Sequence, residues 1–212
     1  PMIVLDDCDM KNAARDAVTY SLTNAGQVCC SIERIFVAES IYDKFLQAVK
    51  QEAGAYKVGN GMDPTVSVGP LVSQLQRDIV RDQVDEAITK GAKIIYQSDA
   101  PSDGGSYYPV TVLADVKDDM KIYRDETFGP VVCVSKFDGS ESQAVKLAND
   151  TVYGLASAVY TTDLEKATRI GQHIEAGQVG INCYVLDHLS AACPWVGHKQ
   201  SGYGFHSGYE GF

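Results

Sequence analysis

The stretch Asn24-Ala25-Gly26-Gln27-Val28-Cys29-Cys30 joins a helical pattern to a strand pattern and places two cysteines at the junction. Before it, apolar residues recur at helical spacing over residues 9–22. After it, residues 34–37 form the short apolar run of a strand. A Gly-Gln turn can hold a thiol in the open, where its thiolate is a strong nucleophile. The alternative is a buried structural cysteine, because free cysteine is among the most buried residue types.

Strand and helix patterns alternate along the whole chain. Apolar runs that predict strands cover residues 3–5, 34–37, 93–96, 108–113, 130–137, 156–160 and 178–182. Helical patterns cover residues 9–22, 41–54, 74–90, 140–149 and 163–176. This order predicts an α/β fold with three α/β/α layers around a mostly parallel twisted sheet. In such a sheet we expect the functional loops at the carboxyl ends of the strands.

Two of the predicted helices carry more detailed expectations. Ser40 is in the position of a cap for the helix over residues 41–54. In the helix over residues 74–90, the expected buried side consists of Leu75, Ile79, Val84, Ala87 and Ile88.

The composition excludes several classes of protein. The chain has 212 residues, enough for one large domain or two small ones, and 45% of them are apolar. Its formal net charge of −10 argues against non-specific binding to nucleic acid or to anionic membranes, since such binding requires a basic surface. No apolar run is long enough to cross a bilayer, and no segment resembles a signal peptide.

The cysteines and histidines show no metal or disulfide pattern. The six cysteines form neither Cys-x-x-Cys pairs nor a disulfide framework, so we expect reduced thiols and a reducing compartment, either the cytoplasm or an organelle matrix. The four histidines lack partners at metal-ligand spacing, and no metal site is expected.

Two further motifs complete a family pattern. After Asn-x-Gly-Gln-x-Cys come Glu126-Thr127-Phe128-Gly129-Pro130 and then Pro194-Trp195-Val196-Gly197-His198-Lys199-Gln200-Ser201-Gly202. In this order the three motifs resemble the aldehyde dehydrogenase superfamily over essentially the whole chain. The resemblance implies that residues 1–212 are a single catalytic domain excised from a longer enzyme. The NAD(P)-binding domain, the general-base glutamate and the oligomerisation strand of that enzyme would lie outside the chain.

The resemblance also implies roles for five residues. Cys29 would be the nucleophile, and its backbone N–H would help to bind the oxyanion. Cys30 would be a neighbour in the substrate pocket. Glu126 would accept hydrogen bonds from the ribose of NAD or NADP, Phe128 would pack near the nicotinamide, and Gln76 would contact the adenosine ribose. The alternatives are a solvated loop position for Glu126 and an ordinary core position for Phe128.

The third motif contains the departures from the family pattern. Trp195 matches an aromatic residue of the aldehyde tunnel, with a core or domain-interface position as the alternative. Val196 replaces a glycine. His206 stands where the family often has a glutamate that assists proton relay, so either His206 performs that relay or the relay is absent.

The implied activity is NAD(P)-dependent oxidation of a small-molecule aldehyde to a carboxylic acid through a thiohemiacetal and a thioester. The alternatives are a CoA-acylating relative and a non-catalytic member of the family. We expect the 212-residue chain to be inactive alone, and the full-length protein to be a homo-oligomer that binds neither nucleic acid nor membrane.

Overall fold

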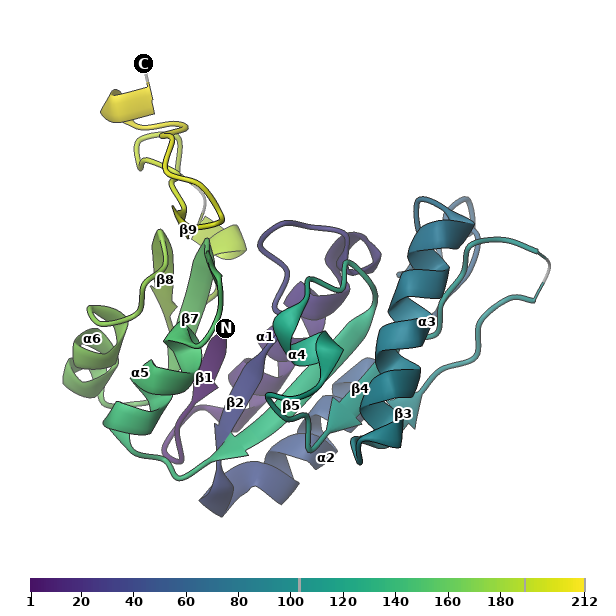
Figure 1. Cartoon of the computed structure of the whole chain (residues 1–212), viewed down its shortest axis with the longest axis horizontal. Helices are drawn as coiled ribbons and strands as arrows, with labels where there is room; N and C mark the ends of the chain where they lie inside the picture. Colours follow the sequence, from purple (N-terminus) through teal and green to yellow (C-terminus); the bar gives the residue numbers. More distant parts are fainter. Residues whose placement is uncertain (103, 189, 212) are drawn as a thin grey trace.

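The computed structural model describes residues 1–102, 104–188 and 190–211, and these form an α/β fold around a mostly parallel sheet (Figure 1). In these residues the sheet has seven strands in the order β3-β4-β5-β2-β1-β7-β8, and only the pairing of β3 with β4 is antiparallel. Its strands are β1 (Met2–Val4), β2 (Ile35–Ala38), β3 (Lys93–Gln97), β4 (Thr111–Ala114), β5 (Val131–Phe137), β7 (Ala156–Tyr160) and β8 (Gln178–Ile181). Two further short strands, β6 (Tyr153–Gly154) and β9 (His198–Lys199), pair with each other.

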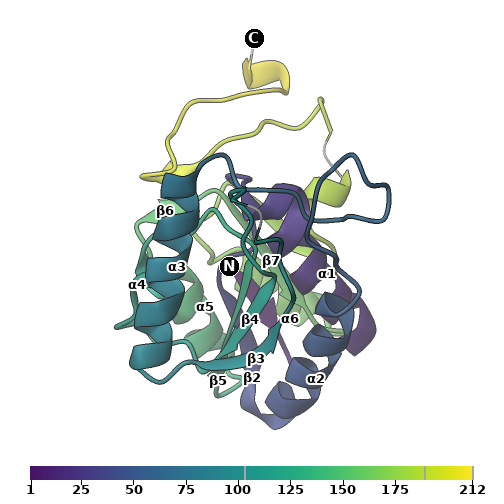
Figure 2. The same ribbon diagram turned by 90° about the vertical axis from the view of Figure 1, so that its right-hand side faces the viewer.

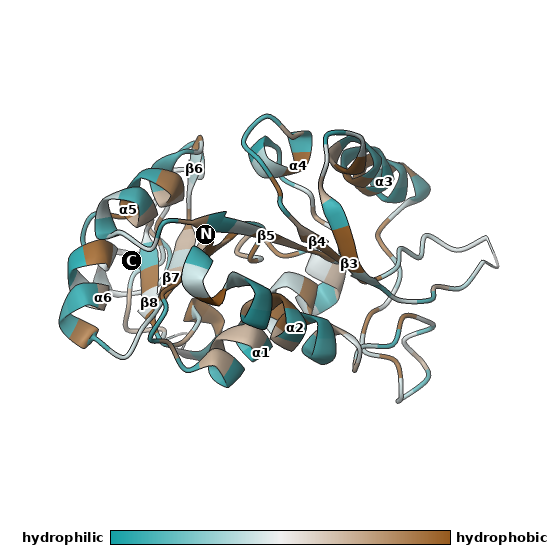
Figure 3. Ribbon diagram, turned by 90° about the horizontal axis from the view of Figure 1, so that it is seen from below, coloured by the Kyte–Doolittle hydropathy of each residue, from teal (hydrophilic) through white to brown (hydrophobic). Residues whose placement is uncertain are grey.

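Helices cover both faces of the sheet, and the expected three-layer fold is confirmed (Figure 3). One face carries α1 (Met10–Leu22) and α2 (Tyr42–Ala53). The other carries α3 (Gln74–Thr89), α4 (Lys121–Arg124), α5 (Glu141–Asn149) and α6 (Leu164–Gly171). Short 3₁₀ turns lie at η1 (Thr23–Gly26), η2 (Glu39–Ile41), η3 (Val185–His188) and η4 (Tyr209–Gly211). Because both faces are covered, β1, β2, β4 and β7 are buried along their full length, which explains their continuous apolar runs.

Among the described residues, four of the six α-helices have a side-chain N-cap, and α2 and α4 do not. Asp9, Ser73, Ser140 and Asp163 each accept a backbone N–H of the first turn of their helix. The expectation that Ser40 caps α2 is wrong. Residues 39–41 form η2, which runs directly into α2, so Ile41 occupies the cap position without a side-chain hydrogen bond.

The expected buried side of α3 is only partly correct. Val84 and Ala87 are buried, but Leu75 is 71% exposed, and Ile79 and Ile88 are also exposed. The buried stripe is instead Val80, Gln83, Val84 and Ala87. The helix is rotated because Val80 packs over Gly129, where a Cβ atom, if there were one, would lie 2.5 Å from Val80 Cγ2.

The loops that carry the predicted site lie at the amino ends of the parallel strands, so the expectation of carboxyl ends is wrong. Residues 29–34 precede β2, residues 123–130 precede β5, and residues 151–155 precede β7. A helix-to-strand connection in a parallel sheet returns to the end where each strand begins, and the first two motifs lie in such connections. The third motif reaches the same end because β9 pairs with β6, which lies just before β7. The segment after β9 extends from this same edge (Figures 1 and 2).

Candidate active site

The cysteine turn has a left-handed backbone that its own side chains brace. Asn24, Ala25 and Gly26 have φ values of 52°, 58° and 75°. The Asn24 side-chain amide donates to the Gln27 carbonyl at 3.1 Å, and the Gln27 amide donates to the Asn24 carbonyl at 3.1 Å. Gln27 Oε1 also accepts the backbone N–H of Val72 at 2.8 Å. The Asn and Gln of the motif therefore fix the turn that leads to Cys29.

The cysteine turn and the Glu126–Pro130 loop touch backbone to backbone. A Cβ atom at Gly26 would lie 2.0 Å from the carbonyl oxygen of Gly129, closer than any side chain could approach. Only glycine allows this contact, and its positive φ at position 26 has the same requirement. The two motifs are thus one structural unit, although they are far apart in the sequence.

The two adjacent cysteines have different environments. Cys29 is exposed, whereas Cys30 is buried and its carbonyl oxygen accepts a hydrogen bond from the Tyr184 hydroxyl. Burial, together with the neighbouring Cys29, raises the pKa of the Cys30 thiol to about 11. Cys30 is consequently a protonated thiol at neutral pH, and Cys29 is the sulfur that a reactant can reach.

A small cavity of about 100 Å³ brings the predicted nucleophile and the predicted ribose ligand together. Cys29, Cys30, Glu33 and Glu126 all line it, and Pro1 at the start of the chain does so as well. Burial raises the pKa of the Glu126 carboxyl. Within the described residues, the Glu126 carboxylate accepts no hydrogen bond, so its two oxygens are available to a ligand.

Phe128 and Gln76 do not line this cavity. Phe128 is half-buried with φ 48°, one residue before the glycine that contacts the cysteine turn. The Gln76 side-chain amide donates to the carbonyls of Thr127 at 2.9 Å and Phe128 at 3.2 Å. Gln76 therefore lies against the backbone of the Glu126 loop, and its side-chain amide holds the two carbonyl groups that follow Glu126.

A larger cavity of about 670 Å³ brings together the predicted residues of the third motif. Trp195 and His206 line it with Cys30, and they form an isolated bridge in which His206 N–H donates to the Trp195 carbonyl at 2.8 Å. Tyr184 and Leu186 are further lining residues. Among the described residues, Cys30 is the one that lines both cavities.

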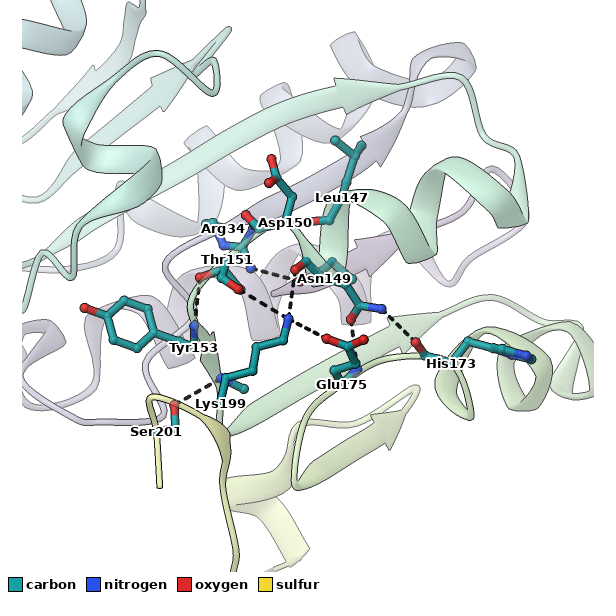
Figure 4. A network of polar contacts seen from close by, with 12 residues as sticks. Arg34, Leu147, Asn149, Asp150, Thr151, Tyr153, His173, Glu175, Lys199 and Ser201 are labelled. Carbon is teal, nitrogen blue, oxygen red and sulfur yellow. Dashed lines mark hydrogen bonds and ion pairs between the residues drawn. The ribbon is translucent and has the colours of Figure 1, made fainter. Parts of the chain in front are cut away.

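The lysine and serine of the third motif fasten the C-terminal segment to the domain (Figure 4). Lys199 Nζ lies 2.7 Å from a Glu175 carboxylate oxygen and donates to the carbonyls of Asn149 at 2.8 Å and Thr151 at 3.3 Å. The Ser201 hydroxyl accepts the N–H of Gly154 at 3.1 Å. Gly154 and Ser201 both line the smaller cavity, so these contacts also shape its rim.

Sequence reasoning missed Glu33 as a site residue. It lies just before β2, lines the smaller cavity and accepts hydrogen bonds from the Glu126 loop. The signal that could have found it is a carboxylate placed between the buried Ile32 and a buried strand.

The described residues show neither a cluster of metal ligands nor a helix that could span a membrane. In residues 1–102, 104–188 and 190–211, no group of three or more His, Cys, Asp or Glu side chains is arranged to hold a metal ion. No helix in the same ranges has the length and apolar character that would let it cross a membrane.

Comparisons with known proteins agree on one family. A profile of the aldehyde dehydrogenase family matches residues 1–212. The chain is 38% identical over 209 residues to a mitochondrial aldehyde dehydrogenase of Leishmania tarentolae, covering 99% of this chain and 41% of that protein. It is 40% identical over 207 residues to a betaine aldehyde dehydrogenase of Sinorhizobium fredii, covering 96% and 42%. The chain thus spans about two fifths of the length of these relatives.

Solved structures show the same relationship. A betaine aldehyde dehydrogenase from Staphylococcus aureus in complex with NAD+ superposes with a TM-score of 0.91 at 38% identity, covering 100% of this chain and 42% of that chain. An aldehyde dehydrogenase of Mycobacterium tuberculosis complexed with NAD+ superposes with a TM-score of 0.92 at 38% identity, covering 99% and 43%. The motifs, the fold and the family match over residues 1–212 lead to one conclusion: the chain belongs to the aldehyde dehydrogenase family.

Proposed function

We propose that residues 1–212 are the cysteine-bearing catalytic domain of an NAD(P)-dependent enzyme that oxidises an aldehyde to a carboxylic acid. The observation that carries the proposal is the shared cavity in which the exposed Cys29 lies with Glu126, whose carboxylate accepts no hydrogen bond from the described residues. The NAD+ complexes of the structural neighbours support the cofactor class. Sequence outside this chain would supply the dinucleotide-binding domain and the general base.

The residues of the site suit the chemistry at sulfur. The Cys29 thiolate would add to the aldehyde carbon to form a thiohemiacetal. The backbone N–H of Cys29 donates to no atom of the described residues, so it is free to bind the oxyanion that forms on addition. Loss of hydride from the former aldehyde carbon would leave a thioester, which water would hydrolyse to the acid.

The free oxygens of Glu126 fit a nicotinamide cofactor. A carboxylate with two open acceptors matches the two hydroxyl groups of a ribose. When bound, the cofactor would supply the acceptor for the hydride. Glu126 would hold its ribose, while Phe128 would lie on the loop beside the ring and Gln76 would support that loop from α3.

The larger cavity disfavours an anionic aldehyde. None of the described residues that line it is Lys or Arg, and Trp195, Leu186 and Val179 are apolar. An aldehyde that carries a carboxylate would lose its hydration there without a cationic partner. Trp195 would form the tunnel wall, Cys30 would lead the aldehyde toward Cys29, and His206 would be placed to relay a proton from this cavity.

The test of the proposed function is chemical labelling combined with turnover in the full-length protein. Iodoacetamide should modify Cys29 faster than the buried Cys133 or the half-buried Cys8, whose pKa values burial raises. Cys29→Ser should abolish NAD(P)H production, and Cys8→Ser should retain it, since Cys8 lines neither cavity. The 212-residue chain alone should produce none. Equal labelling of Cys29 and Cys133, or turnover by the Cys29→Ser variant, would show that the nucleophile is misassigned.

A substrate panel tests the aldehyde class. We expect kcat/KM for an apolar aldehyde to exceed the value for succinate semialdehyde by roughly tenfold or more, because the anionic aldehyde meets a wall without Lys or Arg. Preference for succinate semialdehyde would contradict this part of the proposal.

A further inference from the structure

One half-buried carboxylate, that of Glu33, holds the backbone that carries Glu126. Glu33 Oε1 accepts the N–H of Phe128 at 2.9 Å, and both Glu33 oxygens accept the N–H of Thr127 at 3.0 Å. These are the two amides that directly follow Glu126. Hydrogen bonds of this kind, from N–H groups to a carboxylate, are about twice as strong as those between neutral groups.

The carbonyls of the same segment are held from the opposite side by α3. Gln76 donates to the carbonyls of Thr127 and Phe128, and Gln83 donates to the Glu126 carbonyl at 3.4 Å. The backbone of residues 126–128 is therefore fixed by three side chains, while the side chain of Glu126 stays free. Of the three, Glu33 alone carries a charge and alone binds the N–H groups.

The segment needs this support because its conformation is unfavourable. Phe128 has φ 48°, and a left-handed conformation costs a non-glycine residue about 1–2 kcal/mol. Without an acceptor, the amides of Thr127 and Phe128 would also be unpaired where Thr127 is buried. Loss of the Glu33 carboxylate would let the loop relax and turn Glu126 away from the cavity.

From this geometry we infer that Glu33 is a positioning residue for cofactor binding, because it fixes the loop that aims the Glu126 carboxylate into the cavity of Cys29. The inference rests on the proposed function, in which Glu126 binds the cofactor ribose. Glu33 itself would not touch the cofactor, since both of its oxygens are already bonded to the loop.

The surroundings of Glu33 make its hold on the Glu126 loop sensitive to pH. Burial raises the pKa of Glu33 to about 7, against the lowering effect of its two backbone partners. The charged and titratable groups around it are Glu126, which raises the pKa, and Arg34, Cys133 and Tyr184. Burial favours the neutral acid, whereas the two N–H groups favour the carboxylate. Protonation removes the charge that strengthens both hydrogen bonds, so Glu33 should hold the loop less tightly as the pH falls through this pKa.

The experiment is direct titration of NAD+ or NADP+ into the full-length protein by calorimetry, with variants at Glu33. Glu33→Ala should weaken cofactor binding roughly tenfold or more, the effect expected for losing hydrogen bonds to a charged group. The rate of Cys29 alkylation should change less than the cofactor affinity, because the cysteine turn is also braced by Asn24 and Gln27.

Matched variants separate positioning from a general loss of stability. Asp7 is another carboxylate that accepts two backbone amides, those of Thr162 at 3.1 Å and Asp163 at 3.2 Å, at the opposite edge of the sheet. Asp7→Asn should lower the unfolding midpoint without changing cofactor affinity. Glu33→Gln keeps one acceptor oxygen, so its affinity for the cofactor should lie between those of Glu33→Ala and the unchanged protein. The cofactor affinity of the unchanged protein should fall from pH 8 to pH 6, a window of about one unit on either side of the raised pKa of Glu33. The cofactor affinity of Glu33→Gln should not fall over this window.

The outcomes separate the proposed role of Glu126 in cofactor binding from the positioning role of Glu33. If Glu126→Gln leaves cofactor affinity unchanged, the proposed function of Glu126 is wrong. If Glu126→Gln weakens binding but Glu33→Ala does not, the positioning role alone is overturned. Should Glu33→Ala fail to fold, the pH profile of Glu33→Gln decides, and a profile identical to that of the unchanged protein overturns the inference.

Discussion

Replacing Gly26 by alanine should disrupt the contact on which the whole site depends. The new Cβ atom would lie 2.0 Å from the Gly129 carbonyl oxygen and 2.5 Å from its carbon. Both are backbone atoms that no rotamer change can move away. Either the cysteine turn or the Glu126–Pro130 loop must shift by about 1 Å to reach even a tight contact.

The expected cost has two parts. Alanine at φ 75° costs about 1–2 kcal/mol because the left-handed region is unfavourable for any residue with a Cβ atom. Forcing apart two packed backbones costs a further amount of about 1–3 kcal/mol, as in other overpacked sites. The free energy of unfolding should therefore fall by about 2–5 kcal/mol, a large fraction of the stability of a single domain.

The assay is denaturant unfolding of the 212-residue chain, with Gly91→Ala as the control. Gly91 also has a positive φ of 101°, but a Cβ atom added there would meet nothing within 4 Å, so its variant carries the backbone strain alone. Gly26→Ala should be the less stable by about 1–3 kcal/mol. In the full-length protein it should also slow turnover, since Cys29 and Glu126 would separate. Equal destabilisation of the two variants would refute the claim that the two loops meet backbone to backbone.

Two further substitutions test one contact beside the smaller cavity and one in the core of the domain. Lys199→Met removes the ammonium group that binds Glu175 and two carbonyls, so limited proteolysis of the segment after β9 should accelerate. The control is Lys136→Met, which breaks an exposed ion pair elsewhere and should leave the proteolysis rate unchanged. Tyr160→Phe removes the hydroxyl that donates to the buried Asp16 at 2.7 Å, so the free energy of unfolding should fall by about 1–3 kcal/mol. An unchanged free energy of unfolding, measured by calorimetry, would show that this hydrogen bond does not stabilise the buried Asp16.

Local patterns were sufficient for the layers of the fold. The strand over residues 156–160 and the caps Asp9, Ser140 and Asp163 follow from short-range rules of apolar runs and hydrogen-bonding side chains. The buried side of α3 could not be predicted from these local rules, because the apolar pattern of a helix does not show which part of the fold packs against it. Val80 is buried since Gly129 leaves room for it, and Leu75 is exposed on the side away from that contact.

The sequence by itself determined the α/β order, the family and the two residues, Cys29 and Glu126, on which the proposed chemistry rests. Tertiary structure alone decided that they meet at the amino edge of the sheet, that Gly26 lies against Gly129, and that Glu33 binds the amides beside Glu126. The physical reason is that secondary structure depends on neighbours within a few residues. These contacts join segments far apart in the chain, and their geometry is set by strand order and by the space that the packed backbones leave.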